Sequence, residues 1–138
     1  MSVEFVDTNV LVYAHDSGAG PKRKAGRDLL LRLMETGSGA ISTQVLSEFL
    51  VTVTRKIPKP LTTRTAIDIV EDLATMTVVQ PAVADLVAAA TLAEEHHIHF
   101  WDALIIRSAQ VAGANTLWSE DLSAGQDFDG VVVRNPFA

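Results

Sequence analysis

The stretch VEFVDTNVLVYA, residues 3–14, is an almost unbroken apolar run that carries a carboxylate, Asp7, in its middle. Its first part, Val3–Val6, is short, apolar and rich in β-branched and aromatic residues, which predicts a buried strand with Asp7 at its carboxyl end. An isolated buried carboxylate is costly to keep ionised, so it is hydrogen-bonded, protonated or placed next to a cation. The rest of the chain has to decide which of these holds for Asp7.

The composition predicts one soluble globular domain that spans residues 1–138, because 48% of the residues are hydrophobic and 20% are charged. The chain has no cysteine, which excludes disulfides, thiolate zinc sites and cysteine nucleophiles and is typical of a reducing compartment. No apolar stretch is long enough to cross a bilayer, and no signal-type segment stands at the start. We therefore expect a cytoplasmic protein with no membrane partner.

The charge balance argues against a general nucleic-acid binder, because 17 acids stand against 11 Lys and Arg residues, for a net charge of -6. It leaves a nucleic-acid enzyme open. If four of the 17 acids surround metal ions, 13 remain against 11 bases, which is nearly balanced. The positions of the charges therefore matter more than their sum.

Short apolar runs alternate with amphipathic segments along the chain, which predicts an α/β fold with a mostly parallel sheet covered on both faces. The helices are expected to begin near Lys22, after caps at Ser42 or Thr43 and at Thr62 or Thr63, and near Val83 and Trp101. The strands after the first are expected at Ala40-Ile41, Thr77–Val79, Thr116–Trp118 and Val131–Val133. Ligands bind such sheets outside the carboxyl ends of the strands, where Asp7 and the segment Ser119-Glu120-Asp121 would both lie.

Four acids are embedded in apolar sequence, whereas solvated acids usually have polar neighbours. They are Asp7 in FVDTNVL, Glu48 in VLSEFL, Asp102 in FWDALI and Asp121 in LWSEDL. Oxygen ligands without cysteine, and without a histidine pair at ligand spacing, suit hard cations such as Mg²⁺ or Mn²⁺. The four acids are therefore candidate metal ligands.

Each acid also has a structural interpretation. Asp102 would favour the positive end of its helix, Asp7 would serve as a turn or capping acid, and Glu48 would pair with an arginine. Spacing alone does not bring Glu48 and Asp102 to Asp7, so these alternatives stay open at the level of the residues.

Several motifs in order along the chain resemble one family. The segments VDTNVLVYAHD, ISTQVLSEF, FWDALI and LWSEDLSAGQ, closed by GVVVRNPF, are similar to those of PIN-domain ribonucleases, and in particular to the toxins of VapBC-type toxin–antitoxin pairs. The resemblance runs from Val3 to Phe137. Any one of the segments would be a weak signal, whereas the four-part pattern is specific.

The resemblance implies a three-layer α/β/α sandwich with a five-stranded parallel sheet, and a metal-dependent endoribonuclease whose products carry a 5′-phosphate and a 3′-hydroxyl. The metal would be Mg²⁺ or Mn²⁺, as one or two ions. The family's catalytic and metal-binding acids fall on Asp7, Glu48, Asp102 and Asp121, and its supporting polar residues fall on Thr8, Asn9 and Ser119. Many relatives carry Asn where this chain has Glu120, so the resemblance leaves the role of Glu120 open.

The resemblance also implies partners: an RNA substrate, a cognate antitoxin protein and a second copy of the chain in a homodimer. Two other function classes fit the sequence less well. A PIN-fold module that binds RNA or protein without cutting would be expected to have lost one of the four acids, and all four are present. A receiver-type or phosphoryl-transfer domain needs a lysine near its phosphorylated aspartate, and no lysine follows Lys59.

Secondary signals have two interpretations each. His96-His97-Ile98-His99 is either a metal site or a helix end, and the helix end is favoured because the spacing matches no histidine-based site. His15 and Asp16 are expected to be structural or to lie at the rim of the cleft. Asp127 and Asp129 either assist the site or solvate a loop. The basic residues that either contact RNA phosphates or form a solvated face are Lys22, Arg23, Lys24, Arg27, Arg55, Lys56, Lys59 and Arg64.

Overall fold

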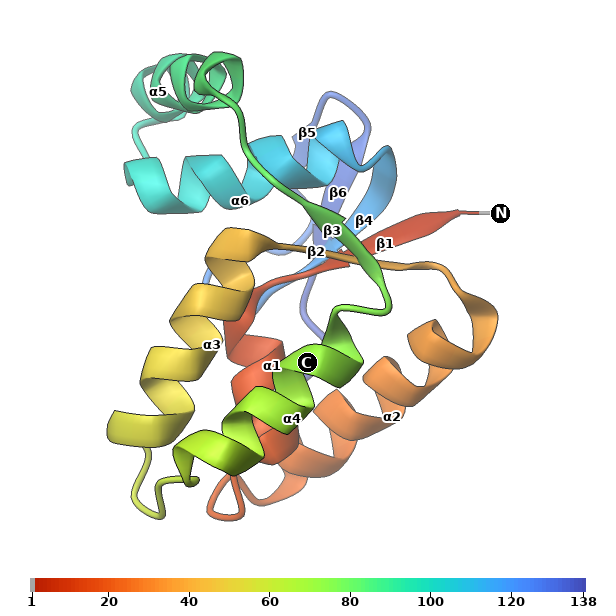
Figure 1. The fold of residues 1–138 in the computed structure, drawn as a ribbon. Helices are drawn as coiled ribbons and strands as arrows, with labels where there is room; N and C mark the ends of the chain where they lie inside the picture. Colours follow the sequence, from red (N-terminus) through yellow and green to blue (C-terminus); the bar gives the residue numbers. More distant parts are fainter. Residues whose placement is uncertain (1) are drawn as a thin grey trace.

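Strand β1, Val3–Val6, lies in the middle of a six-stranded sheet in the computed structural model, which describes residues 2–138 (Figure 1). The strand order is β3-β2-β1-β4-β6-β5. All neighbouring strands are parallel except β5 and β6. The other strands are β2 (Gly39–Ser42), β3 (Thr77–Val79), β4 (Ala114–Trp118), β5 (Asp127–Phe128) and β6 (Val131–Arg134).

Helices cover both faces of this sheet, so the predicted three-layer α/β/α arrangement is confirmed. Figure 1 shows α1 to α4 on one side of the sheet and α5 and α6 on the other. The helices are α1 (Thr8–His15), α2 (Pro21–Thr36), α3 (Thr43–Arg55), α4 (Thr63–Leu73), α5 (Val83–His96) and α6 (Phe100–Val111). No helix within residues 2–138 has the length and apolar character needed to cross a membrane.

The structure differs from the sequence-based prediction in two elements. Helix α1 is not among the predicted elements, because its apolar residues Val10, Leu11 and Val12 are consecutive and buried and so hide the helical periodicity. Strand β5 adds a sixth strand to the expected five. It has two residues and pairs antiparallel with β6, and a run this short carries no readable alternation.

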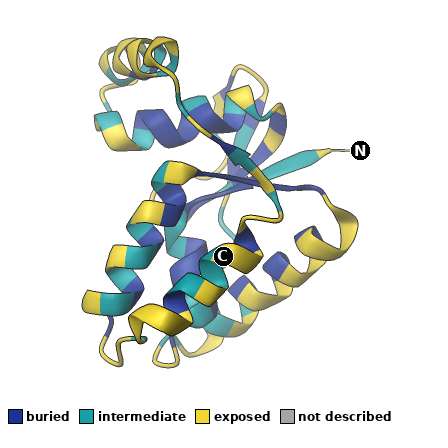
Figure 2. Ribbon diagram, in the orientation of Figure 1, coloured by how far each residue is buried: buried dark blue, intermediate teal, exposed yellow. Residues whose placement is uncertain are grey.

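Helix α1 is held close to its neighbours, which fixes the position of Asp7 at its start. Figure 2 shows the buried residues of the helices turned toward the sheet. Helix α2 crosses α1 at Gly26, where a Cβ atom would come within 3.0 Å of the Val10 carbonyl oxygen and within 3.2 Å of the Ala14 nitrogen. Only glycine permits this approach without a shift of the backbone.

Two of the predicted helix caps are present. The Ser42 hydroxyl accepts from the Val45 amide at 3.2 Å, and the Thr62 hydroxyl accepts from the Thr65 amide at 3.2 Å. Ser42 therefore ends β2 and caps α3, so that α3 starts at the carboxyl edge of the sheet and Glu48 lies about one and a half turns into the helix.

Candidate active site

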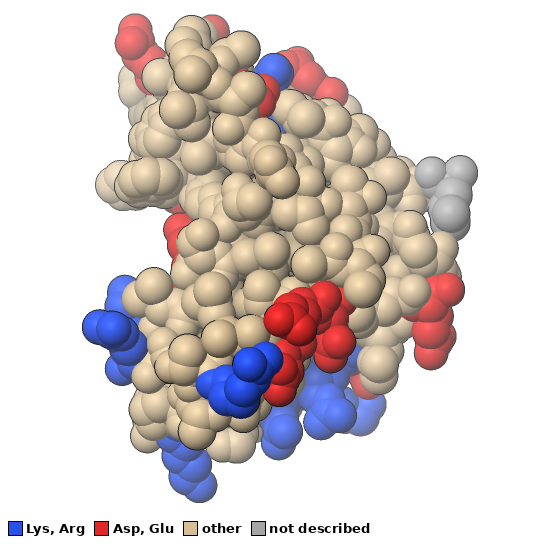
Figure 3. All heavy atoms as spheres, in the orientation of Figure 1, with Lys and Arg blue, Asp and Glu red and all other residues tan. Residues whose placement is uncertain are grey.

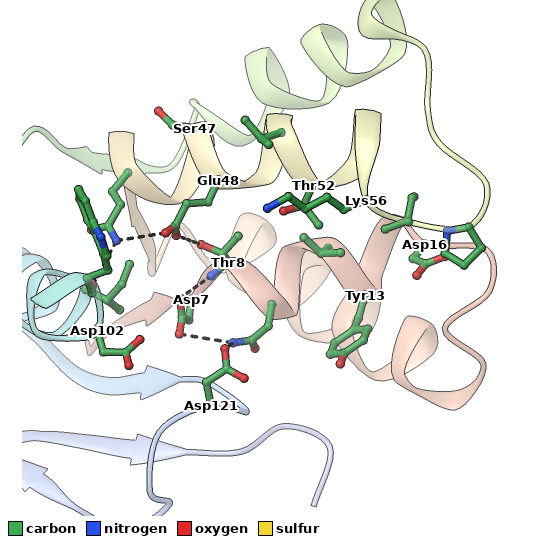
Figure 4. Close-up of a pocket in the computed structure, with 18 residues that line it drawn as sticks. Asp7, Thr8, Tyr13, Asp16, Ser47, Glu48, Thr52, Lys56, Asp102 and Asp121 are labelled. Atoms are coloured by element: carbon green, nitrogen blue, oxygen red, sulfur yellow. Dashed lines mark hydrogen bonds between the residues drawn. The ribbon is translucent and has the colours of Figure 1, made fainter. Parts of the chain in front are cut away.

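The four acids embedded in apolar sequence line one cleft at the carboxyl edge of the sheet. The cleft has a volume of about 700 Å³. Figure 4 shows Asp7, Glu48, Asp102 and Asp121 around its inner part, from β1, α3, α6 and the segment after β4. The fold therefore brings together residues that are up to 114 positions apart in the chain.

Asp7 lies deepest of the four acids and is 5% exposed. It caps α1, because one carboxylate oxygen accepts from the Thr8 amide at 2.7 Å. The other oxygen accepts from the Ser119 hydroxyl at 2.8 Å, and Ser119 is itself fully buried at the end of β4. Ser119 also accepts from the Asp121 amide at 3.2 Å, so one serine fixes two of the acids.

Burial raises the pKa of Asp7 from 3.8 to about 6. The hydrogen bonds from Ser119 and Thr8 act in the opposite direction, and the nearby charges of Asp121 and Glu48 raise the pKa further. Capping is therefore one role of Asp7, as the structural interpretation held. Capping alone does not explain why Asp7 is buried, because a capping carboxylate on the surface would stay ionised without this desolvation cost.

Thr8 and Asn9 stand between the carboxylates. The Thr8 hydroxyl donates to Glu48 at 2.6 Å. The Asn9 amide nitrogen donates to Asp121 at 3.1 Å and lies 3.4 Å from Asp7, and its carbonyl oxygen accepts from the Glu120 amide at 3.2 Å. Both residues were candidates for a supporting role, and in the structure they separate and orient the acids.

Glu48 and Asp102 face the cleft from α3 and α6. Glu48 also receives a hydrogen bond from the Gln44 side chain, at 3.4 Å, and has no Lys or Arg partner among residues 2–138, so the arginine-pair interpretation is wrong. Asp102 lies in the first turn of α6, as expected. Burial, followed by the charge of Asp121, raises the pKa of Asp102, while His99 opposes the shift.

Within residues 2–138 no three Asp, Glu, His or Cys side chains are arranged closely enough to form a metal-binding group. Several of the carboxylates instead accept hydrogen bonds from Thr8 and Asn9. The chemistry of the donor set nevertheless fits a hard divalent cation, because it is all oxygen and none of the four acids is neutralised by Lys or Arg in the described chain.

Glu120 lies outside this set although it adjoins Asp121. Its carboxylate accepts from the Tyr13 hydroxyl at 2.8 Å and pairs with Lys22, and it does not line the cleft. The hydrogen bond from Lys22 is the main reason that the pKa of Glu120 is lowered. The question that the sequence left open about Glu120 is thus answered by its position.

The secondary signals mostly have structural roles. His96 ends α5 and packs edge-to-face against Phe128, and His97 takes a left-handed conformation with φ of 55°, so the helix-end interpretation of the histidine cluster is confirmed. His15 packs against Phe49, with Nδ1 2.8 Å from the Leu11 carbonyl oxygen.

The remaining acidic candidates are Asp16, Asp127 and Asp129, and only Asp16 lines the cleft. Asp16 lines the outer part of the cleft and accepts from the Gly18 amide. Asp127 accepts from the Gly130 amide in the β5–β6 turn, and neither Asp127 nor Asp129 lines the cleft.

Three cleft residues received no specific role from the sequence. Gln44 bridges Glu48 and the backbone carbonyl of Trp101 through its amide nitrogen. Trp101, on α6, and Lys56, at the C-terminal end of α3, also line the cleft. The spacing of Gln44 and Glu48 by four residues on one helix was the signal available for Gln44.

Comparison with known proteins establishes the family. A family model of the PIN domain matches residues 5–125, which is most of the chain. The chain therefore belongs to the PIN-domain family, as its motifs predicted. No curated protein matches the sequence significantly.

Solved structures of the same fold include toxin–antitoxin proteins. A toxin–antitoxin complex from Klebsiella pneumoniae aligns over 98% of each chain, with 22% identity and a TM-score of 0.70. DNA-bound VapBC from Salmonella typhimurium aligns over 99% of each chain, with 17% identity and a TM-score of 0.67. Mycobacterium tuberculosis VapC20, described as a sarcin–ricin loop cleaving toxin, aligns over 83% of this chain and 86% of its own, with 16% identity and a TM-score of 0.63.

Proposed function

We propose that this protein is a metal-dependent endoribonuclease and the toxin of a toxin–antitoxin pair. The observation that carries the proposal is the cleft itself: four carboxylates from distant parts of the chain face one opening without a cationic partner in the described residues, and the most buried of them has a pKa of about 6. Carboxylates so placed repel one another and any phosphate until a cation neutralises them.

Asp7, Glu48, Asp102 and Asp121 would hold one or two Mg²⁺ or Mn²⁺ ions. When bound in such a site, divalent ions lower the pKa of water and stabilise the charge that develops on a phosphodiester under in-line attack. The chain's own contribution is to place the oxygens. Ser119 and the Thr8 amide hold the Asp7 carboxylate, while Asn9 and the Thr8 hydroxyl orient Asp121 and Glu48.

RNA is the proposed substrate because of the family and because one protein of the same fold, VapC20, is described as cleaving the sarcin–ricin loop. The proposed partners are an antitoxin, as in the complexes of the same fold, and a second copy of the chain. An anionic cleft can accept a cationic side chain from an antitoxin. Such a toxin acts on cytoplasmic RNA, so we place the protein in the cytoplasm.

Cleavage of total RNA by the purified protein tests the enzymatic part. Mg²⁺ and Mn²⁺ are compared with EDTA, and Asp7→Asn is compared with Asp28→Asn, an exposed acid on α2 that pairs only with Lys24. We expect cutting that needs the metal, is lost in Asp7→Asn and is kept in Asp28→Asn. Folded wild-type protein that cuts no RNA and binds no Mg²⁺ or Mn²⁺ in a calorimetric titration would overturn the proposal.

The toxin role is tested by expression in bacterial cells. Wild-type protein should arrest growth, and Asp7→Asn, expressed to the same soluble level, should relieve the arrest. Harmless expression of soluble, cleavage-competent wild type would separate the nuclease from the toxin and leave only the enzymatic part.

A further inference from the structure

Trp101 is the most exposed aromatic side chain within residues 2–138, with 62% of its surface accessible, and it directly precedes Asp102. Its ring packs edge-to-face against Phe100, with centroids 5.3 Å apart and planes at 75°. Its backbone carbonyl accepts from the Gln44 amide at 3.1 Å. The ring thus contacts Phe100 and the Trp101 backbone is tied to α3, while most of the residue remains exposed to solvent.

This face belongs to the acidic cleft. Trp101 lines the cleft and also an adjoining groove of about 480 Å³, and Gln44 and Glu48 line both hollows. Pro81 and Leu104 complete the apolar wall of the groove. A flat, apolar surface next to a phosphodiester-cleaving centre is suited to a nucleobase, because every base has a π-face that stacks on an aromatic ring.

Gln44 supplies a polar contact at the same place. Its amide nitrogen donates to Glu48 and to the Trp101 carbonyl, which fixes the orientation of the amide. Its carbonyl oxygen is buried and has no hydrogen-bond partner among residues 2–138. An unpartnered buried acceptor is costly, so Gln44 keeps this orientation for the two hydrogen bonds that its amide nitrogen donates.

Lys56 lies at the other end of the cleft. It caps the C-terminus of α3, 12 residues from Gln44, which corresponds to about 18 Å along a helix. Figure 4 shows its amine end directed along the cleft toward Glu48. No carboxylate within residues 2–138 pairs with it, whereas Lys22, Lys24 and Arg64 all have ion pairs.

Most Lys and Arg residues lie on the same side of the molecule as Lys56. Nine of the 11 Lys and Arg residues lie between Lys22 and Arg64 in the sequence. Figure 3 shows these basic side chains gathered on the half of the molecule formed by α2, α3 and α4, away from α5 and α6. An RNA strand that leaves the acids toward Lys56 would thus meet positive charge.

We propose that Trp101 is a stacking platform for one unpaired base and that Lys56 binds a backbone phosphate further along, so that the cleft receives a single-stranded segment of RNA across the four acids. Gln44 would position Trp101 through its hydrogen bond to the Trp101 carbonyl. The proposal rests on the nuclease function proposed above and adds the residues that position the RNA. A base paired in a duplex would present no free face to Trp101.

Fluorescence tests the stacking without requiring cleavage. In the Trp118→Phe protein, which keeps all four acids, Trp101 is the sole tryptophan. The probe is a ten-nucleotide oligouridylate in Ca²⁺, a cation that an all-oxygen site can also bind. We expect quenching of the Trp101 emission by the single strand and none by a duplex of the same length. Equal quenching by the duplex, or no quenching by either, would overturn the assignment. So would emission that shifts with protein concentration alone, because a second copy of the chain would then cover the indole.

Steady-state cleavage tests the positioning. Trp101→Ala should raise KM about 10-fold with kcat changed less than about 3-fold, and Trp101→Phe should restore most of the loss. Lys56→Gln should raise KM and reduce the slope of log affinity against log salt by about 0.7, while Lys59→Gln, which removes the same charge outside the cleft, should do neither. A fall in kcat alone for Trp101→Ala would mean that Trp101 only supports Asp102, and the inference would fail.

The two proposals fail in different ways. Wild type that neither cuts RNA nor binds Mg²⁺ or Mn²⁺ would overturn the nuclease, whatever the fluorescence shows. If the wild type cuts RNA while Trp101→Ala and Lys56→Gln keep the wild-type KM, only the roles proposed for Trp101 and Lys56 would be overturned.

Discussion

Asp121 and Glu120 are neighbours in the chain, yet they belong to two acidic regions with opposite electrostatics. Asp121 faces the cleft with Asp7, Glu48 and Asp102, where no Lys or Arg side chain pairs with an acid in the described chain. Glu120 points the other way, to Lys22 and the Tyr13 hydroxyl. One peptide unit thus separates a candidate catalytic acid from a structural one.

The direction of the pKa shift distinguishes the two regions. Hydrogen bonds from cations lower the pKa of Glu120 and of Glu4, which pairs with Arg32. Burial and neighbouring acids raise the pKa of Asp7 and Asp102. Acids of the first kind stabilise the fold at neutral pH, whereas acids of the second kind cost stability that a bound cation can restore.

The largest expected effect is on cleavage by the two neighbouring variants. Asp121→Asn should lower kcat/KM by at least about 10³-fold, because it removes a charged oxygen ligand from the proposed metal site. Glu120→Gln should keep activity within about 3-fold of wild type, because its side chain lies outside the cleft. Single-turnover cleavage of an RNA that the wild type cuts measures both.

Circular dichroism of both variants provides the control that they are folded. Comparable losses at positions 120 and 121 would mean that the whole segment after β4 is needed as a unit, and the division into two regions would be wrong.

The next effect is a pH-dependent gain of stability in Asp7→Asn. The pKa of Asp7 is about 6 in the folded protein and 3.8 as the reference value, so the wild type loses a contribution to stability as pH rises through this window. Relative to wild type, Asp7→Asn should gain roughly 2–3 kcal/mol in free energy of unfolding between pH 4 and pH 8. Urea unfolding at half-unit intervals measures this difference, and a flat difference would contradict the pKa assigned to Asp7.

A smaller effect is expected from Mg²⁺. A cation that binds only the folded cleft should stabilise the wild type by about 1.4 kcal/mol at ten times its Kd. The gain should be larger at pH 8 than at pH 5, because Asp7 must be ionised to bind the cation. Thermal unfolding with Mg²⁺, and with Na⁺ at equal ionic strength, measures it. Equal stabilisation of Asp7→Asn would place the ion elsewhere on the protein.

The sequence predicted the architecture and the candidate acids because both leave local signals. Acids embedded in apolar runs and strands followed by capped helices are visible along the chain, and the rule that ligands lie at the carboxyl edge placed Asp7 and Ser119 together, where they hydrogen-bond at 2.8 Å. The position of Glu48 and Asp102 beside Asp7 depends on how α3 and α6 pack, so residue spacing could not supply it and the family resemblance did.

Other features could not be read from the sequence because they depend on contacts across the fold. Helix α1 has a run of consecutive buried apolar residues, so its helical periodicity is hidden. Glu120 and Asp121 have the same local context, and their opposite directions follow from Lys22 and Asn9, which lie about a hundred residues away. The separation of the carboxylates by Thr8 and Asn9 is likewise a tertiary feature.

The smallest expected effect is the loss of stability in Glu4→Gln, a variant of one of the ion-paired acids. Its dependence on pH should be opposite to that of Asp7→Asn. Glu4 accepts two hydrogen bonds from Arg32, at 2.8 and 2.9 Å, and one from the Trp118 indole at 2.9 Å. The first of these is the main reason that its pKa lies below 4.5, so its contribution is present above that value and is lost as pH falls through the folded pKa. Glu4→Gln should cost about 1 kcal/mol at pH 7, because Arg32 is half-exposed, and less at pH 4. Urea unfolding at both pH values measures this cost. A cost that rises toward low pH, as Asp7 would produce, would mean that the two acidic regions do not differ in the way their pKa shifts indicate.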